Sequence, residues 1–251
     1  MLETKAILKK LRESKTFPFA DKKVITSWNA MMIKSLFIAS KIDAKYLSFA
    51  SNSLDALVAK MYSNTVLYHQ CLSPNKLTKK AFLEDYSFLI DTLLAGYDRT
   101  YEKRYLALAT KLTKEAIAKF YHAKKWYLDE KHFALAQYND KYYTSPLGRF
   151  FHDMISVAHL TYDLKFLQEV KGYIKEERDR IVAFVDSSPE AARALLRIDA
   201  ENVVLKSSKQ NLLNSKADVD KIHYPFLLTK VAESRLFYYV TKAVVSFMIR
   251  I

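Results

Sequence analysis

Residues 82–97 read FLEDYSFLIDTLLAGY, and this stretch decides the fold class of the chain. Its apolar side chains recur three and four residues apart, at Tyr86, Leu89, Ile90, Leu93, Leu94 and Tyr97. That spacing places them on one face of an α-helix, which other parts of the protein must cover. A second amphipathic helix is predicted over residues 101–120, followed by short strands at 125–128 and 133–138.

The same order of elements recurs on both sides of this stretch. Upstream, a helix near residues 27–41 is capped by Thr26 or Ser27, and an amphipathic helix follows the candidate cap Asp43. A strand at 65–72 and a turn at 73–75 end this unit. Downstream, helices are predicted from Gly148 and over 166–185, and Pro189 opens part of a fourth pair. The chain therefore contains an internal repeat of about 60 residues.

Alternating buried and half-exposed helices indicate two helical layers, and the helix near 27–41, apolar on almost every side, should be fully covered. A solenoid of helix pairs would give the same pattern, but the β excursions between pairs favour an α/α toroid. We predict a mainly α fold, a partial α/α toroid with short β-hairpins and a β-rich C-terminal segment, as a single domain over residues 1–251.

The two ends of the chain differ from the repeats. Residues 2–13 are predicted as an amphipathic helix. Residues 202–206, 224–228 and 236–249 are β-like, so 202–251 is predicted as a β-rich tail. Its last part, Leu236–Ile251, is apolar enough to require a cover.

The composition limits the classes of fold and partner. With 3 Gly and 5 Pro, the chain has too few turn formers for a many-stranded sandwich or barrel. It has 40 Lys and Arg against 27 Asp and Glu, and its net charge of +13 favours anionic partners. The basic residues are interleaved with acids and no known nucleic-acid-binding motif occurs, so solvated helix faces are the favoured explanation of this charge.

Cys71 is the single cysteine, which excludes a disulfide within the chain and makes the reducing cytoplasm the simplest location. The six histidines show no metal-ligand spacing, so neither a metal nor a cofactor is predicted. Residues 1–14 do not form a secretory signal. No apolar run approaches the roughly 20 residues of a transmembrane helix.

Three segments carry a resemblance to a known family. Residues 21–33 read DKKVITSWNAMMI, residues 82–89 read FLEDYSFL and residues 224–228 read YPFLL. In this order they resemble segments of the YyaL-type thioredoxin-domain proteins, which include spermatogenesis-associated protein 20. The resemblance covers residues 1–230.

The resemblance implies a thioredoxin-like domain followed by a six-hairpin α/α toroid, similar to those of N-acylglucosamine 2-epimerase and the six-hairpin glycosidases. Against the family pattern, we expect residues 1–251 to lack the thioredoxin-like domain and the first helix pairs of the toroid. Lys22 replaces the second Asp of the first motif and Ala30 replaces its Gly, and residues 145–149 read SPLGR where the family has a Ser-Gly-Asn-type loop.

An α/α toroid binds its ligand in the funnel where its inner helices begin. Asp21 and Asp85 are therefore the candidate catalytic carboxylates, acting as general acid or base. The candidate ligand-binding residues are Lys22, Trp28, Asn29, Tyr86 and Arg149. Structural roles compete with each of these: Asp85 in a first turn complements the helix dipole, Trp28 fits a core, and Arg149 fits a solvated surface.

Three functions remain open from the sequence. The first is a non-catalytic remnant that depends on a partner, either a separate thioredoxin-like or N-terminal toroid half or a second copy, to cover its apolar faces. The second is a carbohydrate-binding or epimerase-like or glycosidase-like domain, in which Asp21, Asn29 and Asp85 should converge on one concave pocket. The third is binding of an anionic ligand or nucleic acid, which salt would weaken steeply.

Overall fold

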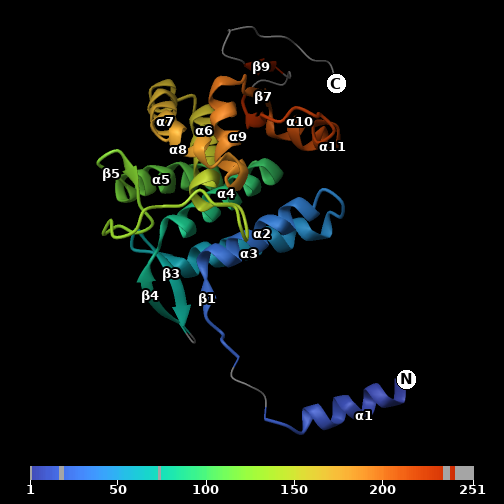
Figure 1. Ribbon diagram of the computed structural model, residues 1–251. Helices are drawn as coiled ribbons and strands as arrows, with labels where there is room; N and C mark the ends of the chain where they lie inside the picture. Colours follow the sequence, from blue (N-terminus) through green and yellow to red (C-terminus); the bar gives the residue numbers. More distant parts are fainter. Residues whose placement is uncertain (1, 17–19, 73–74, 234–237, 241–251) are drawn as a thin grey trace.

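The computed structural model describes residues 2–16, 20–72, 75–233 and 238–240, which are mainly helical and form two rows of helices (Figure 1). The inner row is α2 (Thr26–Ala39), α4 (Leu83–Thr100), α6 (Pro146–Thr161) and α9 (Pro189–Asp199), with each helix packed on the next. The outer row is α3 (Lys45–Met61), α5 (Lys103–Phe120) and α7 (Leu164–Glu176), and each of these packs on the inner helix before it. The predicted repeat of helix pairs is therefore confirmed.

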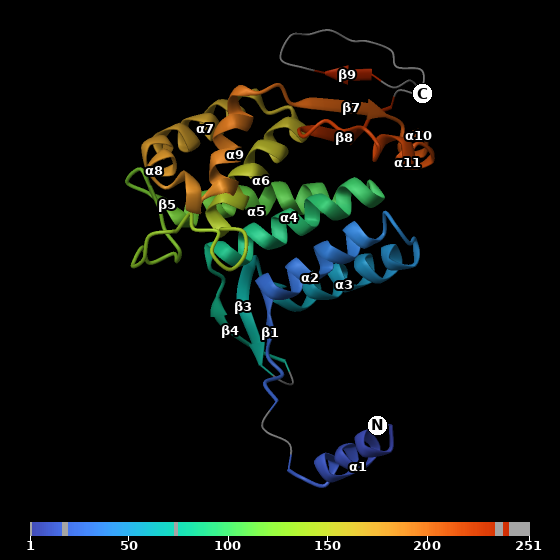
Figure 2. The same ribbon diagram turned by 45° about the vertical axis from the view of Figure 1, so that its right-hand side comes forward.

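α4 lies at the centre of this arrangement, between α2 and α6 and against α5 (Figure 2). Its apolar stripe is buried apart from the half-buried Leu94, and Asp85, Ser87 and Thr92 on its other faces are buried too. The neighbouring helices pack tightly at Gly96, because a Cβ there would lie 3.1 Å from Leu54 and 3.2 Å from Phe37 and Tyr105. The residue at 96 thus sets how closely α2, α3 and α5 surround α4.

Short strands follow the first two outer helices and lie at the end of the molecule where the inner helices begin (Figure 2). β3 (Val66–Leu72) pairs antiparallel with β1 (Val24–Ile25), β2 (Tyr62–Ser63) and β4 (Lys76–Lys80), and β5 (Tyr121–His122) pairs with β6 (Lys125–Trp126). The predicted strand at 65–72 is confirmed. The turn predicted at 73–75 falls partly on residues 73–74, which lie outside the described ranges.

The strand predicted over 133–138 is wrong. Only Leu135 forms a β-bridge, to Tyr127. The carboxylate of Asp129 accepts hydrogen bonds from the amides of Lys131 and Ala134 and so folds this stretch into a turn. The helix predicted over 166–185 is broken, because α7 ends at Glu176 and α8 (Arg178–Ala183) and the short 3-10 helix η1 (Val185–Ser187) follow.

The C-terminal part contains more helix than the predicted β-rich tail. β7 (Val203–Ser207) pairs in parallel with β8 (Leu227–Val231) and antiparallel with β9 (Tyr238–Val240). Between β7 and β8 lie α10 (Lys209–Asn214), which Ser208 caps through the amide of Asn211, and α11 (Lys216–Val219). Most of the segment predicted as strand over 236–249 lies outside the described residues.

Two expectations about α2 are wrong. Neither Thr26 nor Ser27 caps it, because both residues already belong to the helix and the Thr26 hydroxyl donates to the Tyr68 carbonyl at 2.6 Å. The helix is also not covered on every side. Trp28 is 61% exposed and Met32 is 65% exposed, because α2 is the first helix of the inner row and no described helix packs on its outer edge.

α1 (Leu2–Glu13) confirms the predicted N-terminal helix, and it stands apart from the helical body in both views (Figures 1 and 2). Ile7, Leu8 and Leu11 on its apolar face are all more than half exposed. None of the described helices is long and apolar enough to cross a membrane.

Candidate functional site

The sequence placed candidate residues where the inner helices begin, and Asp85 is at the start of α4. Its side chain is fully buried. One carboxylate oxygen accepts a hydrogen bond from the Ser27 amide of α2 at 3.1 Å, and the other accepts from the Phe82 amide and lies 2.9 Å from Nδ1 of His69. Asp85 therefore joins the starts of two inner helices to β3, and this contact raises the pKa of the half-buried His69.

The other candidates at this end do not gather around Asp85. Asp21 and Lys22 lie on the exposed segment before β1, where Asp21 forms an ion pair with Lys23 at 2.8 Å that lowers its pKa. Asn29 is exposed and its amide donates to the Ile25 carbonyl, while Trp28 faces outward from α2.

Tyr86 is buried against Phe120 in the core, and burial raises the pKa of its phenol. Its hydroxyl has no hydrogen-bond partner among the described residues. The described structure thus does not bring Asp21 and Asp85, the two candidate acids, into one pocket.

Arg149 is at the start of α6, but three carboxylates already surround its guanidinium. It lies 3.2 Å from Asp153, 3.7 Å from Asp91 and 2.9 Å from Glu190. Asp91 also pairs with Lys34 of α2 at 2.6 Å. These five residues, which we call the ion cluster, come from all four inner helices. The cluster leaves Arg149 little free capacity for an anionic ligand.

Burial shifts the ionisation of the groups in and next to the ion cluster. Asp153 is 1% exposed, one of its carboxylate oxygens has no described hydrogen-bond partner, and burial raises its pKa. His152 beside it is kept neutral, because burial and the nearby Arg149 and Arg197 lower its pKa to about 2. Burial likewise lowers the pKa of Arg197 to about 9.

A pocket of about 230 Å³ opens beside the starts of α4 and α6, and we call it the rim pocket. The 127–145 loop forms its outer wall and is fixed on both sides. The Leu83 amide donates to the Leu128 carbonyl at 2.9 Å, and Asp140 accepts from the amides of Ser145 and Glu190. The rim pocket is lined by Leu83, Glu84, Leu128, Leu135, Ala136, Gln137, Asn139, Tyr142, Tyr143, Pro146 and Leu147.

The polar groups of the rim pocket are accessible. Tyr142 is 84% exposed and Tyr143 is 44% exposed, and the Tyr143 ring rests on Phe88 with 5.9 Å between ring centroids. Partial burial and the neighbouring Glu84 carboxylate raise the pKa of Tyr143. The pocket thus offers two aromatic rings, one carboxylate and the side-chain amides of Gln137 and Asn139 over an apolar floor.

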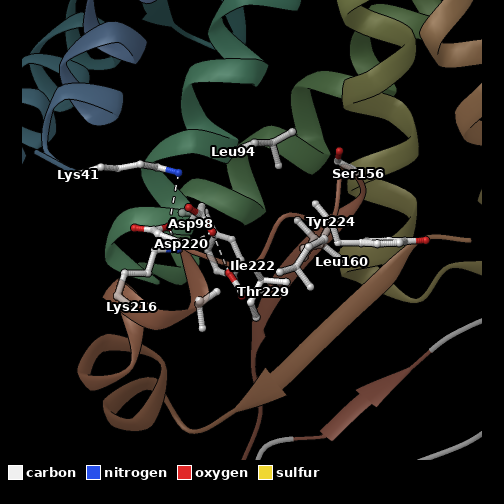
Figure 3. Close-up of a pocket in the computed structure, with 14 residues that line it drawn as sticks. Lys41, Leu94, Asp98, Ser156, Leu160, Lys216, Asp220, Ile222, Tyr224 and Thr229 are labelled. Carbon is white, nitrogen blue, oxygen red and sulfur yellow. Dashed lines mark hydrogen bonds and ion pairs between the residues drawn. The ribbon is translucent and has the colours of Figure 1, made fainter. Parts of the chain in front are cut away.

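A second pocket of about 260 Å³ lies where the inner helices end, and we call it the far pocket (Figure 3). It is closed by α11 and β8, and its charged groups are paired with one another. Asp98 accepts from Lys216 and from the Thr229 hydroxyl at 2.8 Å, and Asp220 lies 3.4 Å from Lys41. These pairs join the C-terminal segment to the helix rows, so the far pocket is better suited to a structural role than to ligand binding.

Sequence reasoning missed the loop residues of the rim pocket and most of the ion cluster. The signal for the cluster was present, because Lys34, Asp91 and Asp153 each interrupt an apolar helical run. The signal for the rim pocket was the pair Tyr142 and Tyr143 in a polar stretch directly before the helix-opening Pro146. Glu84 was not among the predicted site residues. Among the described residues, no group of His, Cys, Asp or Glu could hold a metal ion.

Comparison with known proteins identifies the fold. No protein-family model matches the chain. An uncharacterized protein of Caenorhabditis elegans is 30% identical over 138 residues, which are 51% of this chain and 19% of that protein. The cellobiose 2-epimerase of Spirochaeta thermophila matches with a TM-score of 0.50 at 13% identity, over 64% of this chain and 44% of its own.

A D-mannose isomerase also matches with a TM-score of 0.50, at 12% identity over 63% of this chain and 44% of its own. A GH76 α-mannanase of Bacteroides thetaiotaomicron matches with a TM-score of 0.47 at 21% identity, over 64% and 44% of the two chains. The chain thus spans about a fifth of the length of its curated relative and less than half of the solved structures. The fold is that of α/α-toroid proteins, and the mainly α prediction is confirmed.

Proposed function

We propose that this chain is a non-catalytic α/α-toroid module that binds a neutral sugar ring in the rim pocket. The observation that carries this proposal is the lining of that pocket, which combines Tyr142, Tyr143, Glu84, Gln137 and Asn139 where two inner helices begin. Aromatic faces pack on the apolar C–H face of a sugar, while carboxylate and amide groups hydrogen-bond its hydroxyls.

The size of the rim pocket selects among carbohydrates. Its volume of about 230 Å³ is below the roughly 300–1,000 Å³ of pockets for drug-sized ligands. One ring therefore fits, and further residues of an oligosaccharide would extend past the exposed Tyr142. The printed names of the toroids that share this fold, a D-mannose isomerase and a cellobiose 2-epimerase, make hexoses the first ligands to test.

Binding without bond cleavage is the better fit for the acids at this site. Glycoside hydrolysis generally uses two carboxylates on either side of the bond. Glu84 is the single acid among the residues that line the rim pocket. Asp85 is buried and its oxygens already accept hydrogen bonds, and Asp21 is paired with Lys23 outside the pocket.

Saturation-transfer NMR and calorimetry with mannose, glucose and cellobiose test the proposal. Tyr143→Ala and Glu84→Ala should each weaken binding strongly, whereas Tyr224→Ala in the far pocket should leave it unchanged. Circular dichroism establishes that the variants are folded. Absence of binding to any of the three sugars overturns the proposal, as does loss of binding in Tyr224→Ala alone, which would assign the ligand to the far pocket.

We also propose that the chain belongs to the YyaL-type family that its three motifs resemble. Two of these motifs occupy equivalent positions in successive helix pairs. Residues 21–33 contain the start of the inner helix α2, and residues 82–89 contain the start of the inner helix α4. The third motif, at 224–228, runs into β8 beside the far pocket. Sequencing of the complete gene tests this, because family membership requires that a thioredoxin-like domain be encoded upstream or in an adjacent reading frame.

A further inference from the structure

The groove between α8 and α9 is a second candidate binding site, unrelated to the rim pocket. It has a volume of about 360 Å³ and lies at the end of the helix rows opposite α2. Its walls are aliphatic and come from Ile181, Val182, Val185, Ala192, Leu195, Leu196 and Ile198. Val182 is 57% exposed and Leu196 is 69% exposed, so much of this apolar surface is open to solvent. We call this site the aliphatic groove.

Two cations and one acid complete the lining of the aliphatic groove. Lys175 is on the last turn of α7, and Arg178 follows three residues later at the start of α8. Neither forms an ion pair with any described residue, whereas the nearby Glu176, Glu177 and Arg180 all have partners. Asp199, the acid that also lines the groove, already takes part in an interaction. The lining therefore carries two positive charges against one negative charge, and neither cation has an ion-pair partner within the part of the chain that the structure describes.

We propose that the aliphatic groove binds a free single-chain amphiphile with an anionic head, of the long-chain carboxylate class. The hydrocarbon chain would lie along the aliphatic walls, where each buried methylene is stabilised by the hydrophobic effect. The carboxylate would lie between Lys175 and Arg178, because a planar guanidinium and an ammonium can both donate charge-assisted hydrogen bonds to it.

The dimensions and the charge of the groove decide between this ligand and others. Its volume is within the roughly 300–1,000 Å³ of small-molecule pockets. A sugar is a poor fit, because the walls offer almost no uncharged hydrogen-bonding side chain. A fatty alcohol would leave both cations without a partner, and a cationic amphiphile would be repelled by them.

Displacement of a fluorescent fatty acid from the full chain tests the proposal. Dodecanoate should displace the probe, dodecanol should do so at least tenfold more weakly, and dodecyltrimethylammonium should not. Across saturated acids of 8 to 12 carbons, each added methylene should lower the Kd about fourfold, as expected for about 0.8 kcal/mol per buried CH₂. Equal affinity for the acid and the alcohol would overturn the assignment of Lys175 and Arg178.

Substitutions to Glu inside the groove test the site, and a matched substitution outside it is the control. Arg178→Glu and Val182→Glu should each weaken dodecanoate binding at least tenfold, while Lys165→Glu on the exposed side of α7 should leave it unchanged. All three side chains are exposed, so the variants should remain folded. The proposal is wrong if no fatty acid binds below its micellar concentration. It is also wrong if the groove binds only vesicles, or if light scattering shows a dimer that Val182→Glu dissociates.

Discussion

At the scale of single residues, two charged candidates from the sequence hold helices together: Asp85, predicted as a catalytic acid, and Arg149, predicted to bind a ligand. Asp85 accepts the backbone amides of Ser27 and Phe82, which are donors that a helix start leaves without an intrahelical partner. Arg149 links α4, α6 and α9 through three carboxylates. Both residues lie where the inner helices begin, as predicted, but their bonding capacity is used within the protein.

Asp153 yields a residue-scale prediction about pH. Burial raises its folded-state pKa, so the folded protein retains a proton that the unfolded chain releases above about pH 3.9. The stability that Asp153 contributes is present below that pH and is lost as the pH rises toward the folded pKa. Asp153→Asn cannot ionise and still accepts from Arg149, so its stability relative to wild type should rise with pH, by at most about 1.4 kcal/mol per pH unit.

Urea unfolding at pH 4 and pH 7 measures this difference. Asp91→Asn is the control, because Asp91 pairs with Lys34 and Arg149 and its loss should destabilise the protein at pH 7. If Asp153→Asn instead becomes less stable relative to wild type as the pH rises, Asp153 is ionised in the folded state and the direction argued above is incorrect.

At the scale of elements, the helices could be predicted from the sequence, but the loop that forms the rim pocket could not. The helix pairs follow from apolar spacing that repeats over many residues, as in α4 and α5, which are 18 residues long each. The 127–145 loop has no such period, because its shape depends on Asp129, Asp140 and contacts to α4 and α9 that are distant in sequence. The exposure of α2 was missed because its composition alone does not reveal which of its faces has a neighbour.

Replacing either of two helical glycines should change the stability of the protein, but in opposite directions. At Gly172 in α7 a new Cβ would meet nothing within 4 Å, so Gly172→Ala should stabilise the protein by about 0.5–1 kcal/mol through helix propensity. At Gly96 in α4 the Cβ would press on Leu54, Phe37 and Tyr105, and overpacking should outweigh that gain. Gly96→Val should therefore cost about 1–3 kcal/mol. Thermal unfolding of both variants tests this, and equal effects at the two sites would contradict the packing argument.

At the scale of the whole molecule, the helix rows have an open edge at α2 that carries an apolar surface. Trp28 and Met32 lie four residues apart on one side of this helix and are 61% and 65% exposed, and Ile38 on its last turn is 53% exposed. In a toroid this side would face the preceding helix pair, and the solved toroids that share the fold are more than twice as long as the part that matches. Contiguous apolar surface of this kind promotes association.

We therefore expect the chain to self-associate through α2 as its concentration rises. Met32→Lys combined with Ile38→Lys should shift the chain toward monomer in light scattering at high salt, where the added charge is screened and only the lost apolar contact acts. Lys substitutions at Leu164 and Leu196, which are also strongly exposed but lie on α7 and α9, provide the matched control and should leave the association unchanged. All of the substituted side chains are strongly exposed, and the buried residues Ile33 and Phe37 of α2 are left intact, so both sets of variants should unfold at the same urea concentration as wild type. If the wild-type chain stays monomeric at every concentration, the exposed edge of α2 does not drive association. That result would also remove the strongest structural argument that this module depends on a partner.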